Sequence, residues 1–310
     1  MVIVMRFQFS KTLVALGLLT AVGIPAWAQI DLSGSWAARN HEDSEDKFAG
    51  PSPVDYTGLP INEAARARAL SYSSSQLSEP ERVCLFYPPY YLMMGPFGMK
   101  MWNETDPLTG TTIAWKIGGW EDRAPTTIWM DDRPHPSKNA PHERSGFTTG
   151  VWEGNILTAY TTHIKAGYIR RNGAPGSDEA TVTAHYLRHG DLLTVTMLVE
   201  DPIYLTEPLY RTRTFQLEAA PIAAMGPPCI PGDEGIKKSV VPHYLPSKNP
   251  FVNELTEQLH IPMEAVMGGA ETMYPDFRKK IKDKYTPIEK CVHDCGGPGA
   301  GPGGRGGNGP

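Results

Sequence analysis

The sequence predicts a mainly β protein in which eight antiparallel strands close into a barrel. Three observations lead to this fold class. Between residues 31 and 217 the apolar segments are short, rich in Thr, Val, Ile, Trp and Tyr, and separated by turn residues, as in all-β domains. The connections at 153–155 and 189–191 each place a glycine in a tight loop, which is a strong hairpin signal. The segment 192–200 has one apolar face.

Eight segments have the composition and length of strands. They are 31–36, 111–117, 126–130, 146–152, 156–163, 180–189, 192–200 and 210–217. Successive side chains of a strand point to opposite faces, and in 192–200 one face carries Leu193, Val195, Met197 and Val199. Closure of such a set into a barrel removes exposed strand edges and leaves room for one small ligand.

The first strand contains Gly34, Ser35 and Trp36. This Gly-x-Trp triplet resembles the signature near the first strand of lipocalin-like barrels, in which the indole ring closes one end of the barrel. The resemblance implies a lipocalin-like barrel with Trp36 at one end of its interior.

Residues 37–110 are expected to form an inserted loop region. They include a charged loop, a helix candidate at Ile61–Leu70 and an apolar stretch at 84–102 that Pro and Gly interrupt, so this stretch is not one regular element. It has two interpretations. It is a loop packed over the core, or it is a lid whose aromatic residues, Tyr90 and Trp102 among them, contact a ligand.

The chain divides into four parts. They are a signal peptide at 1–28, the barrel domain at 29–220, a helical and irregular extension at 221–290 that packs on the barrel, and a disordered Gly/Pro-rich tail at 291–310. Within the extension, the spacing of Phe251, Leu255 and Leu259 predicts a helix that Pro262 ends.

Residues 1–28 have the layout of a secretory signal peptide. Arg6 and Lys11 form the charged end, an apolar run covers 13–25, and small residues stand at the cleavage position in 26–28. The apolar run is too short for a spanning helix, and no later stretch is long enough. We therefore expect a periplasmic or secreted protein with no transmembrane segment.

Export places the cysteines in an oxidising compartment, which favours two structural disulfides. The four residues are Cys84, Cys229, Cys291 and Cys295, and the three possible pairings stay open. A small metal clip that includes His293 is the alternative.

Charge and motifs exclude two classes of partner. Without residues 1–28, which contain two basic and no acidic residues, 27 basic residues face 34 acidic ones, a net charge of −7. Such a surface repels nucleic acid. The chain has no Gly-rich phosphate loop, GxSxG elbow or dinucleotide fingerprint, so nucleotide-dependent chemistry is not expected.

The segment 133–173 concentrates histidine and arginine. If the strands 156–163 and 180–189 are neighbours with their Thr/His faces inward, His163 and His185 enter one cavity. The polar wall would then include Thr161, Thr183, His135, His142 and Arg171. No HExxH or His-x-His pair is present, so no cofactor is expected. Zinc or another divalent metal bound by His135, His142, His163 and His185 is the minority alternative.

A cofactor-free enzyme is a second interpretation of these residues. A histidine with a carboxylate neighbour serves as general base near neutral pH, while Arg or Tyr stabilises developing negative charge. The candidates are His163 or His185 as base, Asp178 as its orienting carboxylate, and Tyr168, Arg170 or Arg171 as anion stabiliser. In the alternative reading, residues 169–179 are a solvated loop between strands.

Long blocks of the chain resemble a large family of secreted bacterial proteins. They include "WMDDRPHP", "GVWEGN", "TTHIKAGYIRRNG", "DPIYLTEP" and "GGAETMYP". The resemblance covers residues 31–285 and implies a compact exported β-rich domain, without assigning catalytic residues.

Three functions remain open at this point. The first is an exported barrel that binds a small, partly apolar molecule between the aromatic stretch 84–102 and a His/Arg/Thr wall. The second is a hydrolase, lyase or isomerase that acts on such a molecule. The third is a structural envelope protein without a ligand. The sequence leaves the oligomeric state open.

Overall fold

The computed structural model describes most of the chain after the predicted signal peptide. The described residues are 30–39, 54–56, 58–73, 87–92, 98–118, 125–170, 172–219, 241 and 243–285. Residues 1–28, all four cysteines, Arg171 and the tail 291–310 lie outside them. The signal peptide, the disulfides and the disordered tail therefore stay predictions.

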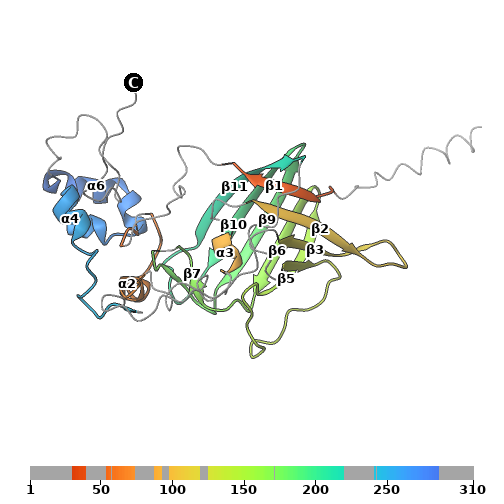
Figure 1. Cartoon of the computed structure of the whole chain (residues 1–310), viewed down its shortest axis with the longest axis horizontal. Coiled ribbons are helices and arrows are strands. Elements are labelled where there is room, and N and C mark those ends of the chain that lie inside the picture. The colour runs from red at the N-terminus through yellow and green to blue at the C-terminus, as the bar shows by residue number, and fades with distance from the viewer. Residues whose placement is uncertain are drawn as a thin grey trace, which may run out of the picture. The chain divides into compact units, whose positions relative to one another are not determined.

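Nine strands form one closed barrel (Figure 1), in the order β1-β11-β10-β9-β6-β5-β4-β3-β2. Their bounds are β1 Gly34–Ala38, β2 Met99–Thr105, β3 Thr112–Gly118, β4 Thr126–Trp129, β5 Phe147–Glu153, β6 Ile156–Thr162, β9 Thr181–His189, β10 Leu192–Glu200 and β11 Leu209–Glu218. A separate small sheet pairs β7, Gly167–Tyr168, with β8, Pro175–Gly176. The mainly β barrel is confirmed, but the expected eight antiparallel strands are wrong in number and orientation.

The additional strand is β2, which lies in the region expected to be an inserted loop. It pairs with β1 on one side and β3 on the other, with Met101 opposite Gly34 and Ile117. Met99 and Met101 are buried, whereas Lys100 and the last three residues of the strand are exposed. The alternation of apolar and polar side chains in β2 is therefore too short to indicate a strand next to the Pro- and Gly-rich sequence before it.

Strands β4 and β5 are parallel, with Ile128 opposite Thr148 and Trp129 opposite Thr149. Parallel neighbours need a long crossover, and residues 130–146 supply it between these strands. The barrel is therefore mixed. The prolines at 134, 136 and 141 exclude a regular helix from this crossover, and sequence alone does not fix the direction in which such a segment returns.

The two predicted hairpins are confirmed. Residues 154 and 155 join β5 to β6, and residues 190 and 191 join β9 to β10. Gly154 and Gly190 have φ angles of 65° and 59°, which glycine adopts without the steric cost of a side chain. The predicted apolar face of β10 is also confirmed, because Leu193, Val195, Met197 and Val199 are all buried.

The described helices are short. They are α2 Glu63–Leu70, α3 Pro89–Leu92, α4 Glu254–Leu259, α5 Met263–Val266, η2 Ala270–Met273, α6 Pro275–Ile281 and η3 Lys282–Lys284. Asn62 caps α2 by accepting a hydrogen bond from the Ala65 amide at 3.0 Å. Helix α4 ends at Leu259, and the next residue, His260, has a left-handed backbone conformation. Pro262 follows two residues later. None of these helices is long and apolar enough to span a bilayer.

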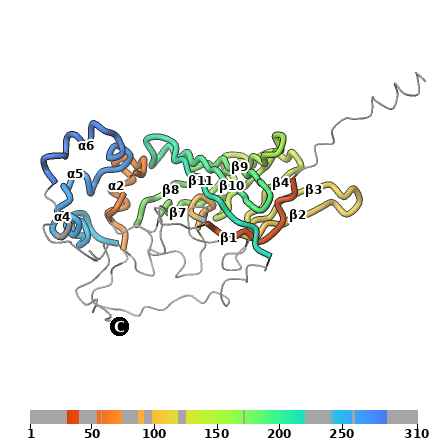
Figure 2. The backbone as a smooth tube through the Cα atoms, turned by 90° about the horizontal axis from the view of Figure 1, so that it is seen from above, coloured from red at the N-terminus to blue at the C-terminus, as the bar shows by residue number. Residues whose placement is uncertain are grey.

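A hydrophobic cluster continues from the barrel strands to the helices. It includes Val182 and Val199 of the barrel, Ala65 and Ala69 of α2, and Val266 of α5. Helix α2 lies next to β8 (Figure 2). The cluster also contains Met197 of β10, so it reaches the barrel interior.

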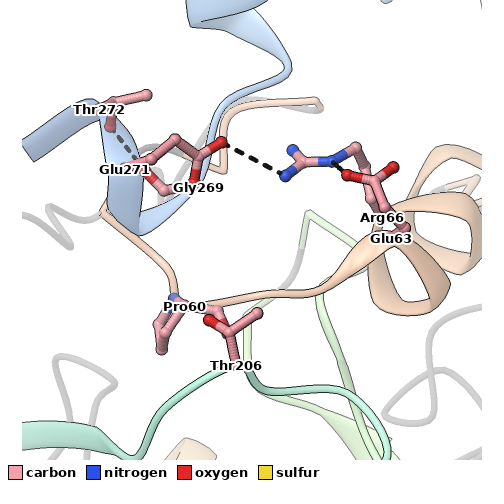
Figure 3. Close-up of polar contacts among 7 residues, drawn as sticks. All are labelled: Pro60, Glu63, Arg66, Thr206, Gly269, Glu271 and Thr272. Carbon is pink, nitrogen blue, oxygen red and sulfur yellow. Dashed lines mark hydrogen bonds and ion pairs between the residues drawn. The ribbon is translucent and has the colours of Figure 1, made fainter. Parts of the chain in front are cut away.

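Polar contacts join α2, η2 and the loop after β10 (Figure 3). The buried Arg66 lies 3.4 Å from a carboxylate oxygen of Glu63 and 3.7 Å from one of Glu271. The Thr206 hydroxyl donates to the Pro60 carbonyl at 3.1 Å. These contacts attach the helical segments to the barrel through its β10–β11 connection.

Candidate functional site

The inward face of the barrel is defined by strand register and burial. Tyr186 lies opposite Leu157 on β6 and Val195 on β10, and Val195 lies opposite Arg213 on β11. Trp152 of β5 lies opposite Leu157. These five residues form one row across five neighbouring strands, which we call the donor row. It combines two aliphatic side chains with three that carry N–H or O–H donors.

Two indole groups on this face have no hydrogen-bond acceptor in the part of the chain that the structure describes. The Nε1 atoms of Trp115 and Trp152 are buried and have no partner among the described residues. Buried polar groups are nearly always hydrogen-bonded, so such exceptions need an explanation. The hydroxyls of Thr148 and Thr161 also lie inside, but they bond to each other at 2.8 Å.

The Tyr186 hydroxyl contributes a third donor. Burial raises the pKa of Tyr186 far above its ordinary value, because the charged phenolate is disfavoured away from water. The side chain therefore stays neutral and keeps its O–H at any physiological pH.

Two arginines also face inward from β11. Arg211 lies opposite Met197 and Arg213 opposite Val195, on the buried face of β10. Both side chains are half-buried. Sequence reasoning missed them, although their alternation with Phe215 in "YRTRTF" was a signal that places them on the core face.

Trp36 fills one end of the barrel interior. It is fully buried, and its Nε1 donates to the Leu32 carbonyl at 3.0 Å. The guanidinium carbon of Arg188 lies 5.2 Å from the indole ring centroid, a cation–π distance. The Nε of Arg188 donates to the Gly190 carbonyl at 2.7 Å. Arg188 therefore supports this end of the barrel.

The predicted inward placement of Thr183 and His185 is wrong. Strands β6 and β9 are neighbours, as supposed, but His185 lies opposite Thr158 and Thr183 lies opposite the exposed Tyr160. Thr161 alone among the predicted strand residues faces inward. Because the side-chain period of a strand is two, the buried Val182, Ala184 and Tyr186 force the alternate residues of β9 outward.

His163 also lies outside the interior, for a different reason. Strand β6 ends at Thr162, and His163 has a φ of 55°, so the alternation does not continue to it. Its Nε2 atom bonds to the Ser137 carbonyl and its Nδ1 to the Thr162 hydroxyl, both at 2.8 Å.

His135 joins the same hydrogen-bonded chain. Its Nδ1 lies 2.8 Å from the Thr162 hydroxyl and its Nε2 lies 2.8 Å from the Thr149 hydroxyl. Because the Ser137 carbonyl only accepts, Nε2 of His163 must donate, and Nδ1 of a neutral His163 then accepts from Thr162. Thr162 in turn accepts from Nδ1 of His135, whose Nε2 accepts from Thr149. We call this chain the histidine relay.

The histidine relay holds the β4–β5 crossover against the outside of the barrel. Arg133 lies near the start of this crossover. Its guanidinium carbon is 3.4 Å from the centroid of the Trp129 ring, and its Nε donates to a carboxylate oxygen of Asp131 at 2.7 Å. His142 bonds through Nδ1 to the Ile164 carbonyl at 3.1 Å, and its ring centroid lies 5.1 Å from that of His163.

The relay as it stands does not fit a metal site. Among the described residues no carboxylate is hydrogen-bonded to His135 or His163, whereas the general-base hypothesis requires one. Both ring nitrogens of His135 and of His163 are used in hydrogen bonds within the chain. Among the described residues, no three His, Cys, Asp or Glu side chains form a group that could hold a metal ion. His185 bonds to the Thr158 hydroxyl at 2.9 Å, and Thr158 donates to Glu153 at 3.1 Å, on the outer surface.

The other predicted site residues are dispersed. Asp178 lies exposed in the turn after Ser177, and within the described part of the chain no hydrogen bond joins it to a histidine. Tyr90 is fully buried in the hydrophobic cluster, and its neighbours Tyr87 and Tyr91 are buried there too. Trp102 lies on the outer face of β2, with the Lys100 ammonium 5.8 Å from its ring centroid.

Tyr168 and Arg170 lie in neither the donor row nor the histidine relay. The Tyr168 ring packs edge-on against Tyr72 at 5.4 Å between centroids, and Arg170 is buried after β7. The segment that carries them is therefore packed structure, and the solvated-loop reading holds only for its exposed end at Asp178 and Glu179.

We expect the histidine relay to make stability depend on pH. Burial, and then the neighbouring His163, lowers the pKa of His135, so the folded state resists protonation. In the unfolded chain the pKa of a histidine is about 6.5. The contribution of neutral His135 to the free energy of unfolding is fully present above this pH and is lost as the pH falls below it. Urea unfolding of the wild type and of His135→Gln at several pH values measures this pH dependence of stability. The difference in unfolding free energy between them should shrink between about pH 8 and about pH 5. A constant difference would contradict the assignment.

Comparison with known proteins adds no relative. No family model, curated protein or solved structure matches the chain. The resemblance to secreted bacterial proteins therefore stays a prediction.

Proposed function

We propose that the protein is exported and that the barrel interior binds a small, partly apolar molecule. The observation that supports this most directly is the pair of buried indole N–H groups of Trp115 and Trp152, which have no acceptor among the described residues. A bound molecule with an acceptor atom would satisfy one or both groups. A nine-stranded barrel is also of the size that accommodates one small ligand.

The composition of the donor row fits such a ligand. Leu157 and Val195 offer apolar contact, while Trp152, Tyr186 and Arg213 offer donors. Ligand sites in proteins are mostly apolar, with a few polar groups that orient the molecule. The polar wall proposed here consists of Trp, Tyr, Arg and Thr. The histidines of the sequence-based hypothesis lie outside it.

A fluorescence titration tests the proposal. The neutral apolar probe N-phenyl-1-naphthylamine should bind the wild type saturably, with an increase in emission. The variant Ala184→Leu adds volume to the inner face of β9 and should abolish or strongly weaken probe binding. The matched variant Thr183→Leu adds an apolar side chain to the outer face of the same strand and should leave probe binding unchanged.

Two outcomes would contradict the proposal. In one, the wild type shows no saturable binding. In the other, both leucine variants bind the probe as the wild type does, which would place the probe outside the barrel. Circular dichroism of the three proteins distinguishes lost binding from lost folding, and Ala159→Val, on the neighbouring strand, provides a milder inward change.

A further inference from the structure

We propose that the bound molecule is an uncharged carbonyl compound on an apolar body, such as a ketone, ester or quinone, and that its carbonyl oxygen accepts a hydrogen bond from the indole N–H of Trp115. This inference rests on the function proposed above and names its ligand class. It concerns the side of the interior lined by β3, β4 and β5, which are neighbours in the barrel.

The position of Trp115 follows from the strand register. Trp115 of β3 lies opposite Ile128 of β4, and Ile128 lies opposite Thr148 of β5. Both of these residues are buried, and the Thr148 hydroxyl bonds to that of Thr161 inside the barrel. Trp115 lies in the same row and is itself only 2% exposed. Its side chain therefore belongs to the barrel interior.

The indole N–H of Trp115 lacks an acceptor. Its Nε1 atom is buried and has no hydrogen-bond partner within the part of the chain that the structure describes. An indole nitrogen only donates, and a buried donor without an acceptor costs free energy that a bound acceptor would recover. Trp152, which also faces inward, has an Nε1 atom in the same condition, so the feature occurs at two places in one barrel.

The groups around Trp115 favour an acceptor without charge. The residues opposite it, Asn103 of β2 and Ile128 of β4, are uncharged, and a buried carboxylate beside them would be costly without a compensating cation. Arg211 and Arg213 extend from β11, which β1 and β2 separate from β3, and both already have contacts within the chain. An alcohol or an ammonium group would bring a further donor to a site that lacks an acceptor. A carbonyl oxygen accepts without adding a donor or a charge.

The wall next to Trp115 is aliphatic. Gly150 lies on the inward face of β5, and a β-carbon there would lie 2.6 Å from Cγ2 of Ile128, 2.8 Å from Sδ of Met130 and 3.1 Å from Cδ1 of Leu157. These three side chains therefore meet over the glycine and form an apolar surface. An alkyl or aryl body is stabilised by contact with such a surface, whereas the hydroxyl groups of a sugar would be buried without partners.

Four aromatic ligands of equal carbon number test the inference. Propiophenone carries a carbonyl group, and propylbenzene has a methylene group in its place. Near neutral pH, 1-phenylpropylamine is a cation and 3-phenylpropanoate is an anion. Each ligand is titrated into the complex of the full chain with N-phenyl-1-naphthylamine. Propiophenone should displace the probe at a lower concentration than either charged ligand, because neither charge finds a compensating partner beside Trp115.

A tryptophan variant localises the effect. Trp115→Phe removes the N–H group and keeps an aromatic ring, so it should reduce the affinity for propiophenone, relative to that for propylbenzene, roughly fivefold to tenfold. Trp102→Phe makes the same substitution on the outer face of β2 and should leave this affinity ratio unchanged. Circular dichroism checks that both variants fold.

Nuclear magnetic resonance of the indole groups gives a second readout, which the wild type alone provides if Trp115→Phe fails to fold. In proton–nitrogen correlation spectra, propiophenone should move an indole N–H proton of the wild type downfield, because the proton becomes hydrogen-bonded. Propylbenzene should not cause this shift. In folded Trp115→Phe the cross-peak that moves should be absent.

The outcomes separate the two proposals. An affinity ratio that is the same in the wild type, Trp115→Phe and Trp102→Phe overturns the carbonyl inference while the barrel remains a binding site. Tighter binding of the cation or the anion than of propiophenone also overturns it, as does an indole spectrum that saturating propiophenone leaves unchanged. If N-phenyl-1-naphthylamine does not bind the wild type at all, the proposed function itself fails.

Discussion

Substitution of Asp201 by alanine is expected to lower the free energy of unfolding by about 4 kcal/mol. The carboxylate is 4% exposed and accepts four hydrogen bonds. The Ser177 amide donates to Oδ2 at 2.7 Å, and the Ser177 hydroxyl donates to Oδ1 at 2.7 Å. The amides of Ile203 and Tyr204 donate to Oδ1 at 3.0 and 3.1 Å. Alanine would leave these donors without their acceptor in a site with little access to water.

Two further variants make the Asp201 experiment specific. Asp201→Asn keeps an acceptor for the three donors at Oδ1 but places an NH₂ group against the Ser177 amide, so it should cost less than alanine and still more than a surface change. Asp178→Asn alters an exposed carboxyl in the adjoining turn and should stay within about 0.5 kcal/mol of the wild type. Urea unfolding compares the proteins. An alanine variant as stable as Asp178→Asn would show that Asp201 does not hold the β8 and β10 ends together.

The parts of the fold that the sequence predicted are those that depend on local patterns. The hairpins at Gly154 and Gly190 follow from short-range backbone requirements, and the buried face of β10 follows from the two-residue period. Strand β2 and the parallel pair β4–β5 depend on contacts between distant segments. For example, Met101 becomes a strand residue because Gly34 and Ile117 lie on either side of it.

The site was mispredicted where two faces of a strand looked equally polar. On β9 the choice of inward face rests on Val182, Ala184 and Tyr186 against Thr181, Thr183 and His185. The first set is the more apolar, so this choice could have been made from sequence. The position of His163 could not have been predicted. Its positive φ ends the alternation of the strand, and nothing in the sequence indicates this φ.

The inward arginines show the opposite case, in which the pattern was present but not used. Arg211 and Arg213 alternate with Thr212 and Thr214 and precede Phe215 on the same face. Charged residues are rarely buried without a compensating partner. A charged pair on the core side of a predicted barrel strand therefore marks polar residues of the barrel interior more clearly than the histidines do, which find hydrogen-bond partners on the outer surface.

Substitution of Trp36 by alanine is the second change for which a large loss of stability is expected. The side chain is fully buried at one end of the barrel, and removal of a buried tryptophan side chain costs about 3 to 5 kcal/mol through lost apolar contact and the cavity that remains. Trp36→Ala would also leave the Leu32 carbonyl without its indole donor and Arg188 without the ring beneath its guanidinium group.

The experiment compares two aromatic positions on neighbouring strands. Trp36→Ala should lower the urea midpoint strongly, and Trp36→Phe should lower it less, because most of the apolar volume is kept while the hydrogen bond to Leu32 is lost. Trp102→Ala removes the same kind of side chain from the outer face of β2, where it is only partly buried, and should cost no more than about 1 to 2 kcal/mol. If Trp36→Ala and Trp102→Ala were equally destabilising, the Gly-x-Trp residue would have no special role in closing this barrel. A larger loss at Trp36 is expected because its side chain is fully buried, whereas that of Trp102 is only partly buried.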